Sequence, residues 1–255
     1  INATTDVIAF ESGNAFTFGV NDSPITPAKL KQINLLNAAT SAGTINLTGN
    51  GGSPAIQGLL ADITPLFNDF NLTGTTGAIE WSGNPTVRVD DVKDTPNGLT
   101  GIVSAAAINA IDAKTTGQVT ITNPGGITGT TAEVTTLLGS TGATGIANGL
   151  AAGDSIIVTD SMTVAQANVI DDSAATVSGT ISTTNLTGTN ALDDIGELNN
   201  YTVTVEDTVA DAAALNTVNT KTSGLITVNS GSVSGIQSAV LTALSAPTTE
   251  IAGLG

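Results

Sequence analysis

The sequence predicts a mixed α/β fold: a right-handed solenoid of helix-strand half-coils with a parallel sheet, plus an N-terminal β-rich element. The main observation is a pattern that returns along the chain: a Thr-Val-Ala helix start, an Ala/Leu/Ile helix, a small-residue turn ending in glycine, and a β-branched strand. Its clearest copies are 163–181 and 208–226, which align from threonine to glycine without a gap. Such self-similarity is typical of repeat proteins, in which each unit buries its apolar face against the next.

Glycines mark the predicted strands of four copies. The segments GTINLTG, GQVTITN, GTISTTN and GLITVNS begin at Gly43, Gly117, Gly179 and Gly224. A short helix is predicted before each glycine by residue pairs spaced i, i+3. These pairs are Ile33/Leu36, Ile108/Ile111, Ile170/Ser173 and Leu215/Val218.

A second helix-like segment follows each of these strands. The four segments are 53–63, 130–138, 189–198 and 232–244, the last with an apolar face at Val233, Ile236 and Val240. Further strands are predicted at 155–159 and 201–205. Each half-coil then takes roughly 22 residues, within the range of about 20 to 29 residues for solenoid turns with one strand and one helix. A strand that returns through a helix to lie beside the next strand makes a parallel, right-handed crossover.

Helix starts support the same reading. Thr26-Pro27 and Ser53-Pro54 each place a capping oxygen before a proline at the first helical position. The segment Thr130 to Glu133 has the pattern of a capping box.

The chain divides into three predicted regions. Residues 1–25 are an N-terminal β element, 26–99 a first repeat with an aromatic insertion, and 100–255 a repeat solenoid. The segment 8–20 alternates apolar and polar residues, which predicts a β-hairpin or two strands. Most aromatic residues lie in the first third, where they either close the end of the solenoid or contact a neighbouring subunit. For the second alternative, the predicted self-association residues are Phe10, Phe16, Phe18 and Trp81.

Both ends of the chain bear on assembly. The sequence begins at Ile1, and 245–255 resembles the start of another half-coil without a polar capping unit. An uncapped solenoid exposes sheet edge and core. We therefore expect continuation of the chain or head-to-tail assembly.

Composition and charge exclude several functions. The chain has 255 residues, 40% of them apolar, and a mean hydropathy of +0.25, which indicates a folded protein. No apolar run approaches the roughly 18 residues of a membrane helix. The net charge of −16 argues against binding nucleic acid or an anionic membrane surface, because phosphates require clustered Lys and Arg. Divalent cations and a salty medium are the expected partners, although negative charge also keeps an apolar-rich chain soluble.

The chain contains neither cysteine nor histidine. Disulfides, zinc-thiolate sites and thiol catalysis are therefore excluded, as are Ser-His-Asp triads and histidine-ligated metals. We expect a protein that is not an enzyme and has no certain cofactor.

Carboxylates gather where predicted strands end. Asp160 and Asp207 come just before the helices predicted to begin at Thr163 and Thr208, where they can cap free N–H groups. Calcium binding is the functional alternative, because hard cations take several carboxylate, carbonyl and hydroxyl oxygens. The predicted metal ligands are Asp90, Asp91, Asp160, Glu206 and Asp207. Neither an EF-hand loop nor a calcium nonapeptide run is present.

The wording Val-x-Asp, Thr-Val-Ala-x-Ala and Thr-Ser-Gly-x-Ile-Thr in 158–181 and 203–228 resembles the Ala/Thr/Gly/Asp-rich repeats of large secreted bacterial surface proteins. These include surface, adhesin and filament proteins of cyanobacteria and other aquatic bacteria. The resemblance covers most of residues 100–245. It implies an extracellular or cell-surface, multi-copy, non-enzymatic role, with calcium as a candidate ion.

Two functions follow. The first is a structural protein: a self-associating subunit or segment of a surface fibre, layer (S-layer) or adhesin. The second is a carbohydrate-binding or carbohydrate-active solenoid, as in phage tail proteins or lyases, that uses exposed Asp rows and Trp81. Surface glycans would then be partners. A content of 3% aromatic residues is poor material for sugar platforms, which favours the first.

Overall fold

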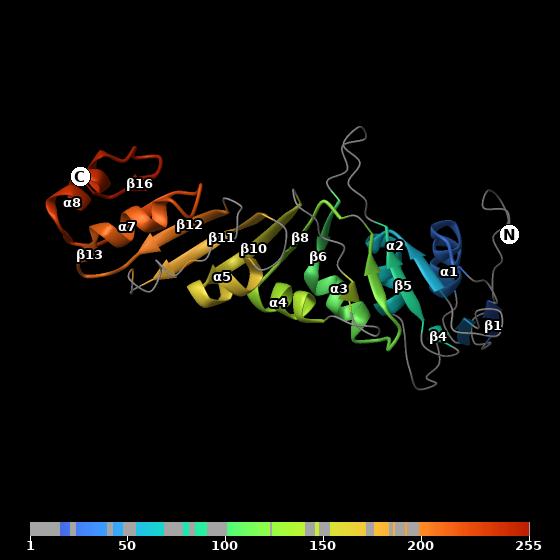
Figure 1. The fold of residues 1–255 in the computed structure, drawn as a ribbon. Coiled ribbons are helices and arrows are strands. Elements are labelled where there is room, and N and C mark those ends of the chain that lie inside the picture. Colours follow the sequence, from blue (N-terminus) through green and yellow to red (C-terminus); the bar gives the residue numbers. More distant parts are fainter. Residues whose placement is uncertain are drawn as a thin grey trace. The chain divides into compact units, whose positions relative to one another are not determined.

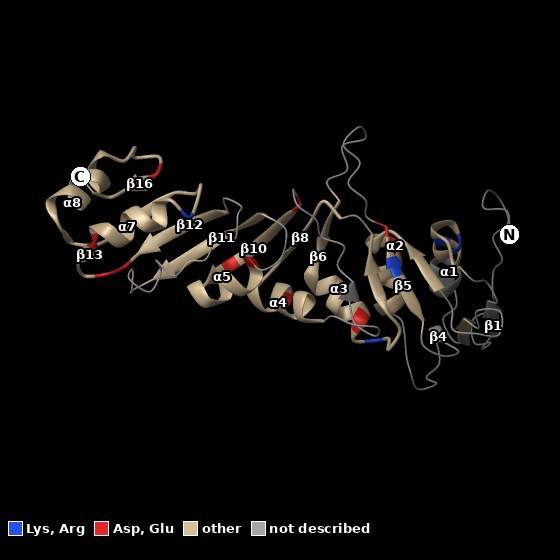
Figure 2. Cartoon of the chain, in the orientation of Figure 1, with Lys and Arg blue, Asp and Glu red and all other residues tan. Residues whose placement is uncertain are grey.

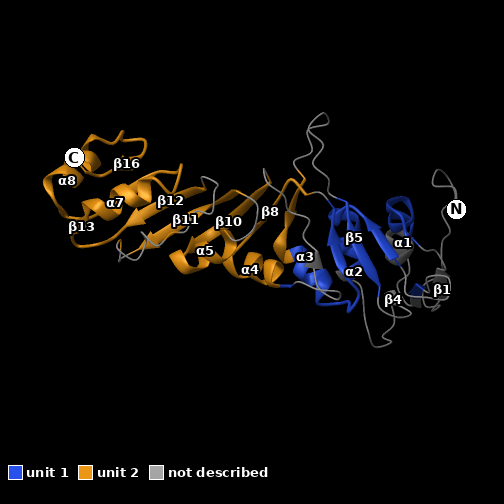
Figure 3. Ribbon diagram, viewed as in Figure 1, with its two compact units in different colours: residues 1–91, 107–122, 140–148 blue, residues 92–106, 123–139, 149–255 orange. Residues whose placement is uncertain are grey.

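The computed structural model describes residues 16–20, 24–39, 43–47, 55–68, 79–81, 85–90, 101–122, 124–140, 146–147, 154–171, 176–183, 186, 192 and 199–254. The fold is mixed α/β, and all strand pairs among these residues are parallel (Figure 1). The chain forms two compact units (Figure 3). Unit 1 comprises residues 1–91, 107–122 and 140–148; unit 2 comprises 92–106, 123–139 and 149–255.

Unit 1 contains two parallel sheets whose strands lie in chain order. The first consists of β1 (Phe16–Val20), β2 (Gly43–Leu47) and β4 (Ile79–Trp81). The second consists of β3 (Ala55–Gly58), β5 (Thr86–Val89), β7 (Val119–Ile121) and β9 (Ile146–Ala147). From β2 to β5 the chain alternates between the two sheets.

The helices of unit 1 are α1 (Pro27–Ala39) and α2 (Leu60–Asn68), which pack against each other. The boundary between the units falls within α3 (Ala105–Asp112). A row of buried β-branched residues runs through the second sheet, each paired with the next: Ile25, Ile56, Val87 and Val119. Successive members are 31, 31 and 32 residues apart.

Unit 2 is built on a sheet that has seven strands among the described residues and runs in chain order. Its strands are β6 (Ile102–Ser104), β8 (Gly126–Gly129), β10 (Ser155–Met162), β11 (Thr176–Thr183), β12 (Asn200–Val205), β14 (Ile226–Val228) and β16 (Ile251–Ala252). A smaller parallel pair joins β13 (Ala210–Asp211) to β15 (Val233–Ser234).

The helices of unit 2 are α4 (Thr131–Gly139), α5 (Val164–Asp171), α7 (Ala212–Asn219) and α8 (Gln237–Ser245). Helix α4 packs against β8, β10 and α5, and α7 packs against α8. Each of α4, α5, α7 and α8 connects two neighbouring strands of the large sheet, as β-α-β crossovers do.

Two rows of buried residues form the core of unit 2. The first row is Val103, Ile127, Ile156 and Val177, and the second is Ile181, Val203, Ile226 and Ile251. All eight side chains are buried. Members of the second row are 22, 23 and 25 residues apart, close to the predicted half-coil length.

Most predicted elements are confirmed. Strands occupy the segments after Gly43 and Gly117, around Gly179 and after Gly224, and the strands predicted at 155–159 and 201–205 are β10 and β12. The first helix of each copy is α1, α3, α5 or α7. Helix α4 confirms the segment 130–138, and α1 begins at Pro27 as predicted.

Three predicted helix starts are wrong, and strand pairing explains each. The helix predicted from Ser53-Pro54 begins at Leu60, because residues 55–58 pair with β5 as strand β3. The helix predicted from Thr208 begins at Ala212, because Ala210 and Asp211 pair with β15. The last helix begins at Gln237, with Val233 in β15 and Ile236 exposed rather than on a buried face.

The N-terminal β element is described only in part. Strand β1 pairs in parallel with β2, and the rest of segment 8–20 lies outside the described residues. The predicted second helix at 189–198 is described only at Leu192, which is buried.

Candidate functional site

The strand-end carboxylates are the first candidate site, and Asp160 of β10 shows what they do. One of its oxygens accepts hydrogen bonds from the backbone N of Thr131 (2.6 Å) and from the Thr131 hydroxyl (2.7 Å). Thr131 is the first residue of α4, so Asp160 caps that helix. The hydrogen bonds from the Thr131 hydroxyl and then from its backbone lower the pKa of the Asp160 carboxyl.

Glu206 and Asp207, which follow β12, also bind neighbouring segments. Asp207 accepts a hydrogen bond from the backbone N of Leu186 at 2.9 Å. Glu206 accepts one from the side-chain amide of Asn229 at 2.7 Å, and Asn229 follows β14, the next strand of the sheet. The carboxylates therefore tie one coil to another.

Capping was predicted for Asp160 and Asp207, but the helix is different. Asp160 caps α4, which precedes it in the chain, and Asp207 binds Leu186, also upstream. The N-terminus of α5 has its own capping box: the backbone N of Thr163 donates to Gln166 (2.8 Å), and the backbone N of Gln166 donates to the Thr163 hydroxyl (3.3 Å). Helix α7 is capped by Asp211, which accepts from the backbone N of Ala214 at 2.8 Å.

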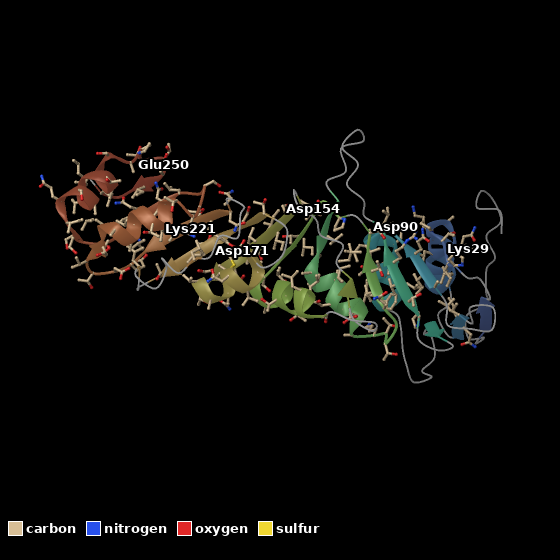
Figure 4. All side chains as sticks on the ribbon, in the orientation of Figure 1. Lys29, Asp90, Asp154, Asp171, Lys221 and Glu250 are labelled. Carbon is tan, nitrogen blue, oxygen red and sulfur yellow. The ribbon has the colours of Figure 1, made fainter. Side chains whose placement is uncertain are left out.

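Asp90 lies in unit 1, directly after β5. It forms an ion pair with Arg88 at 2.9 Å, on the exposed side of the strand. Asp91 lies outside the described residues. Within the described ranges, no three or more Asp or Glu side chains gather as a metal site would require. Calcium binding at these five residues stays a prediction. Figure 4 labels Asp90 and other charged residues.

A buried polar cluster in unit 2 was not predicted. Asn199 is fully buried; its side-chain oxygen accepts from the backbone N of Val177 at 2.7 Å, and its amide donates to Asp171. The Thr222 hydroxyl accepts from the backbone N of Tyr201 at 2.8 Å. These bonds join three successive coils through side chains, where buried polar groups need partners.

A sequence signal for part of this cluster exists in the repeat itself. Thr222 lies two residues before Gly224, and Thr115 lies two residues before Gly117. The Thr222 hydroxyl accepts from the backbone N of Gly224 (3.0 Å) and donates to the Tyr201 carbonyl (2.8 Å). The Thr115 hydroxyl accepts from Gly117 N (2.9 Å) and donates to the Pro85 carbonyl (2.6 Å). We call this arrangement the Thr-x-Gly turn.

The predicted self-association residues fall on the first sheet of unit 1 as far as they are described. Phe16 and Phe18 of β1 pair with Gly43 and Ile45 of β2. Trp81 of β4 pairs with Leu47 of β2, and Leu47 is buried. Phe10 lies outside the described residues. A role of these four residues in self-association stays a prediction.

Two surface hollows complete the candidate features. One, of about 340 Å³ in unit 1, is lined by side chains of β3, β5 and β7 that include Gln57, Arg88 and Thr120. The other, of about 600 Å³ in unit 2, lies by α7 and α8, with Asn219, Leu241 and Glu250 in its lining.

Comparison of the chain with protein-family models, with curated proteins and with solved structures finds no match. In the part of the chain that the structure describes, no helix is both long enough and apolar enough to cross a membrane.

Proposed function

We propose that this protein is an extracellular structural protein: a self-associating repeat subunit or segment of a surface fibre, layer or adhesin. We further propose that its α/β fold is a right-handed solenoid with an N-terminal β-rich element. The observation that carries the proposal is the strand order of unit 2, where parallel strands follow one another in chain order across one sheet. Stacked repeats have this order, because each coil contacts only its neighbours.

Such a sheet supports assembly. An edge strand presents unpaired backbone N–H and C=O groups to another chain, and a heterologous contact that does not close produces a filament. The resemblance of 158–181 and 203–228 to secreted bacterial surface repeats supports the extracellular location.

The charge of −16 sets the conditions for assembly. Copies of an acidic chain repel one another unless salt or divalent cations screen the charge. Calcium bound by strand-end carboxylates is the ion that we propose to test.

Electron microscopy of the purified protein, in calcium-containing and in chelated buffer, is the test. Fibres or sheets that form with calcium and disperse on chelation support both the assembly and the ion. Fibres in both buffers retain the structural function without calcium, and monodisperse particles in both contradict the proposal.

The N-terminal interface has its own test. Trp81→Ala is expected to weaken self-association without unfolding the protein, with Leu59→Ala, a change at an exposed residue of unit 1, as the control. Normal assembly of the Trp81→Ala variant would remove Trp81 from the interface.

Glycan binding is the second candidate, favoured by the unit 1 hollow. Gln57, Arg88 and Thr120 are paired in register across β3, β5 and β7 and carry groups that hydrogen-bond sugar hydroxyls. Retention of the protein on immobilised polysaccharides, lost in Gln57→Ala and retained in Gln118→Ala at the rim, would support this function. Equal retention of both variants would contradict it.

A further inference from the structure

The α8 end of unit 2 exposes large apolar side chains. Ile236, Leu241 and Leu244 are 74%, 62% and 53% exposed, and Ala243 is the one residue of α8 that is buried. Leu241 and Leu244 are three positions apart and therefore lie on the same side of the helix. Helix α7, in contrast, buries Leu215 and Val218. Exposed apolar groups gathered in one place are typical of an interaction surface.

A sheet edge belongs to the same end of the unit. Strand β16 is the terminal strand in the order of the large sheet, and among the described residues it pairs with β14 alone. Helix α7 is already covered by α8, and the Asn216 amide of α7 donates to the Ala239 carbonyl of α8 at 2.9 Å. The surface formed by α8 and β16, which we call the α8 face, is therefore what this end offers to a partner.

Charge narrows the partner. From Thr222 to Gly255 the sequence has one charged residue, Glu250, whereas the whole chain carries −16. Figure 2 shows α8 without the charged residues that mark other parts of the chain. Glu250 already accepts a hydrogen bond from the Asn219 amide at 3.1 Å. A strongly charged partner would find no complementary charge on this face. A second copy of this acidic chain, in contrast, meets the least repulsion here.

We propose that the α8 face binds the α8 face of a second copy about a two-fold axis, with Leu241 and Leu244 of both copies at the apolar centre. The proposal rests on the self-association proposed above and names its surface and its symmetry. An apolar, nearly neutral face is self-complementary, as an isologous contact requires. Two β16 edges related by a two-fold axis run antiparallel, and antiparallel strands pair without a crossover connection.

The test is sedimentation velocity on the full chain over a range of concentrations. The wild-type chain is expected to dimerise, and Leu241→Asp is expected to raise the dimer dissociation constant about tenfold or more, because it places like charges across the axis. Val169→Asp is the matched control, since Val169 is 54% exposed on α5 and the charge change is the same. Leu241 is exposed, so circular dichroism is expected to show an unchanged fold for the variant.

A charge exchange tests the two-fold axis itself. Leu241→Asp and Leu241→Lys are each expected to be monomeric alone and to form a heterodimer when mixed, because residue 241 then faces residue 241. If both are monomeric and mixing restores nothing, the two-fold arrangement is wrong. If wild type and Leu241→Asp associate equally, the α8 face is wrong while self-association stands. A wild-type chain that is monomeric at every concentration overturns both.

Discussion

The two units use the same kind of buried row at different spacings. In unit 1, Ile25, Ile56, Val87 and Val119 follow one another at 31 to 32 residues, whereas the row from Ile181 to Ile251 in unit 2 repeats at 22 to 25. The additional residues of unit 1 lie in connections between strands. Lengthening a surface connection changes its closure entropy only slowly, about 0.6 kcal/mol for each doubling of length. The rows are therefore the constant feature, and the connections are free to differ.

The tightness of the backbone differs as well. A methyl group added at Gly224 in unit 2 would lie 2.2 Å from the Tyr201 carbonyl oxygen, whereas one at Gly58 in unit 1 would meet the tip of the Leu30 side chain at 2.8 Å. Backbone cannot move aside as a side-chain tip can. The shorter coils of unit 2 thus demand glycine more strictly than the longer coils of unit 1 do.

Truncating the rows is expected to have the largest effect in both units. Ile156→Ala in unit 2 and Ile56→Ala in unit 1 each remove a buried side chain, and each is expected to lower the free energy of unfolding by roughly 2–4 kcal/mol. Chemical denaturation followed by circular dichroism measures both, with Val169→Ala on the surface as the control. A loss below about 1 kcal/mol in one variant would show that its row is not the core of that unit.

Adding a methyl group at the glycines separates the units. Gly224→Ala is expected to lower the unfolding free energy by about 2 kcal/mol or more, and Gly58→Ala by less than about 1 kcal/mol, because only the first collides with backbone. Gly231→Ala is the control, since nothing lies within 4 Å of its added methyl. Thermal melting of the three variants gives the ranking. Equal losses at Gly224 and Gly58 would contradict the difference in tightness.

The Thr-x-Gly turn occurs in both units with different burial. Thr222→Val is expected to lower stability by roughly 1–3 kcal/mol, because its partners are buried and lose their hydrogen bonds without access to water. Thr115→Val is expected to lower it by about 0.5–1 kcal/mol, because water reaches its half-buried site. Urea denaturation compares them, with the exposed Thr136→Val as the control. A larger loss at Thr115 would reverse the comparison.

Two carboxyls are expected to respond to pH in opposite directions, with the smallest effects. The lowered pKa of Asp160 means that its cap stabilises the fold above the ordinary value of 3.8 and that this contribution is lost as the pH falls through the folded pKa. Burial raises the pKa of Asp112 in unit 1, so ionised Asp112 destabilises the fold and this penalty is relieved as the pH falls toward 3.8.

The variants Asp160→Asn and Asp112→Asn measure these contributions. At pH 7, Asp160→Asn is expected to lower stability by roughly 0.5–1 kcal/mol, a value reduced by the exposure of the cap, and Asp112→Asn is expected to raise it. Both differences are expected to shrink below pH 3.8. Urea denaturation at pH 7 and pH 3 checks them, and two shifts of the same sign at pH 7 would contradict the assignment.

Much of the fold could be predicted from the residues alone. Alternating β-branched residues after Gly43, Gly117 and Gly224 predicted strands, and the capping box at Thr130 to Glu133 forms between the predicted partners: the backbone N of Thr130 donates to Glu133 at 2.8 Å. These signals are local, because side-chain alternation and helix capping act within a few residues of the chain. The predictions that failed were helix starts such as Ser53 and Thr208, where a strand from another coil pairs with the segment.

The candidate site divides along the same line. The sequence by itself determined that carboxylates stand at strand ends and that hydroxyls precede the repeat glycines. Only the tertiary structure decided that Asp160 caps α4 rather than α5, that Asn199 and Thr222 join successive coils, and that the α8 face carries exposed apolar groups. The physical reason is distance along the chain: these partners are 21 to 29 residues apart, and no local preference selects a partner from the neighbouring coil.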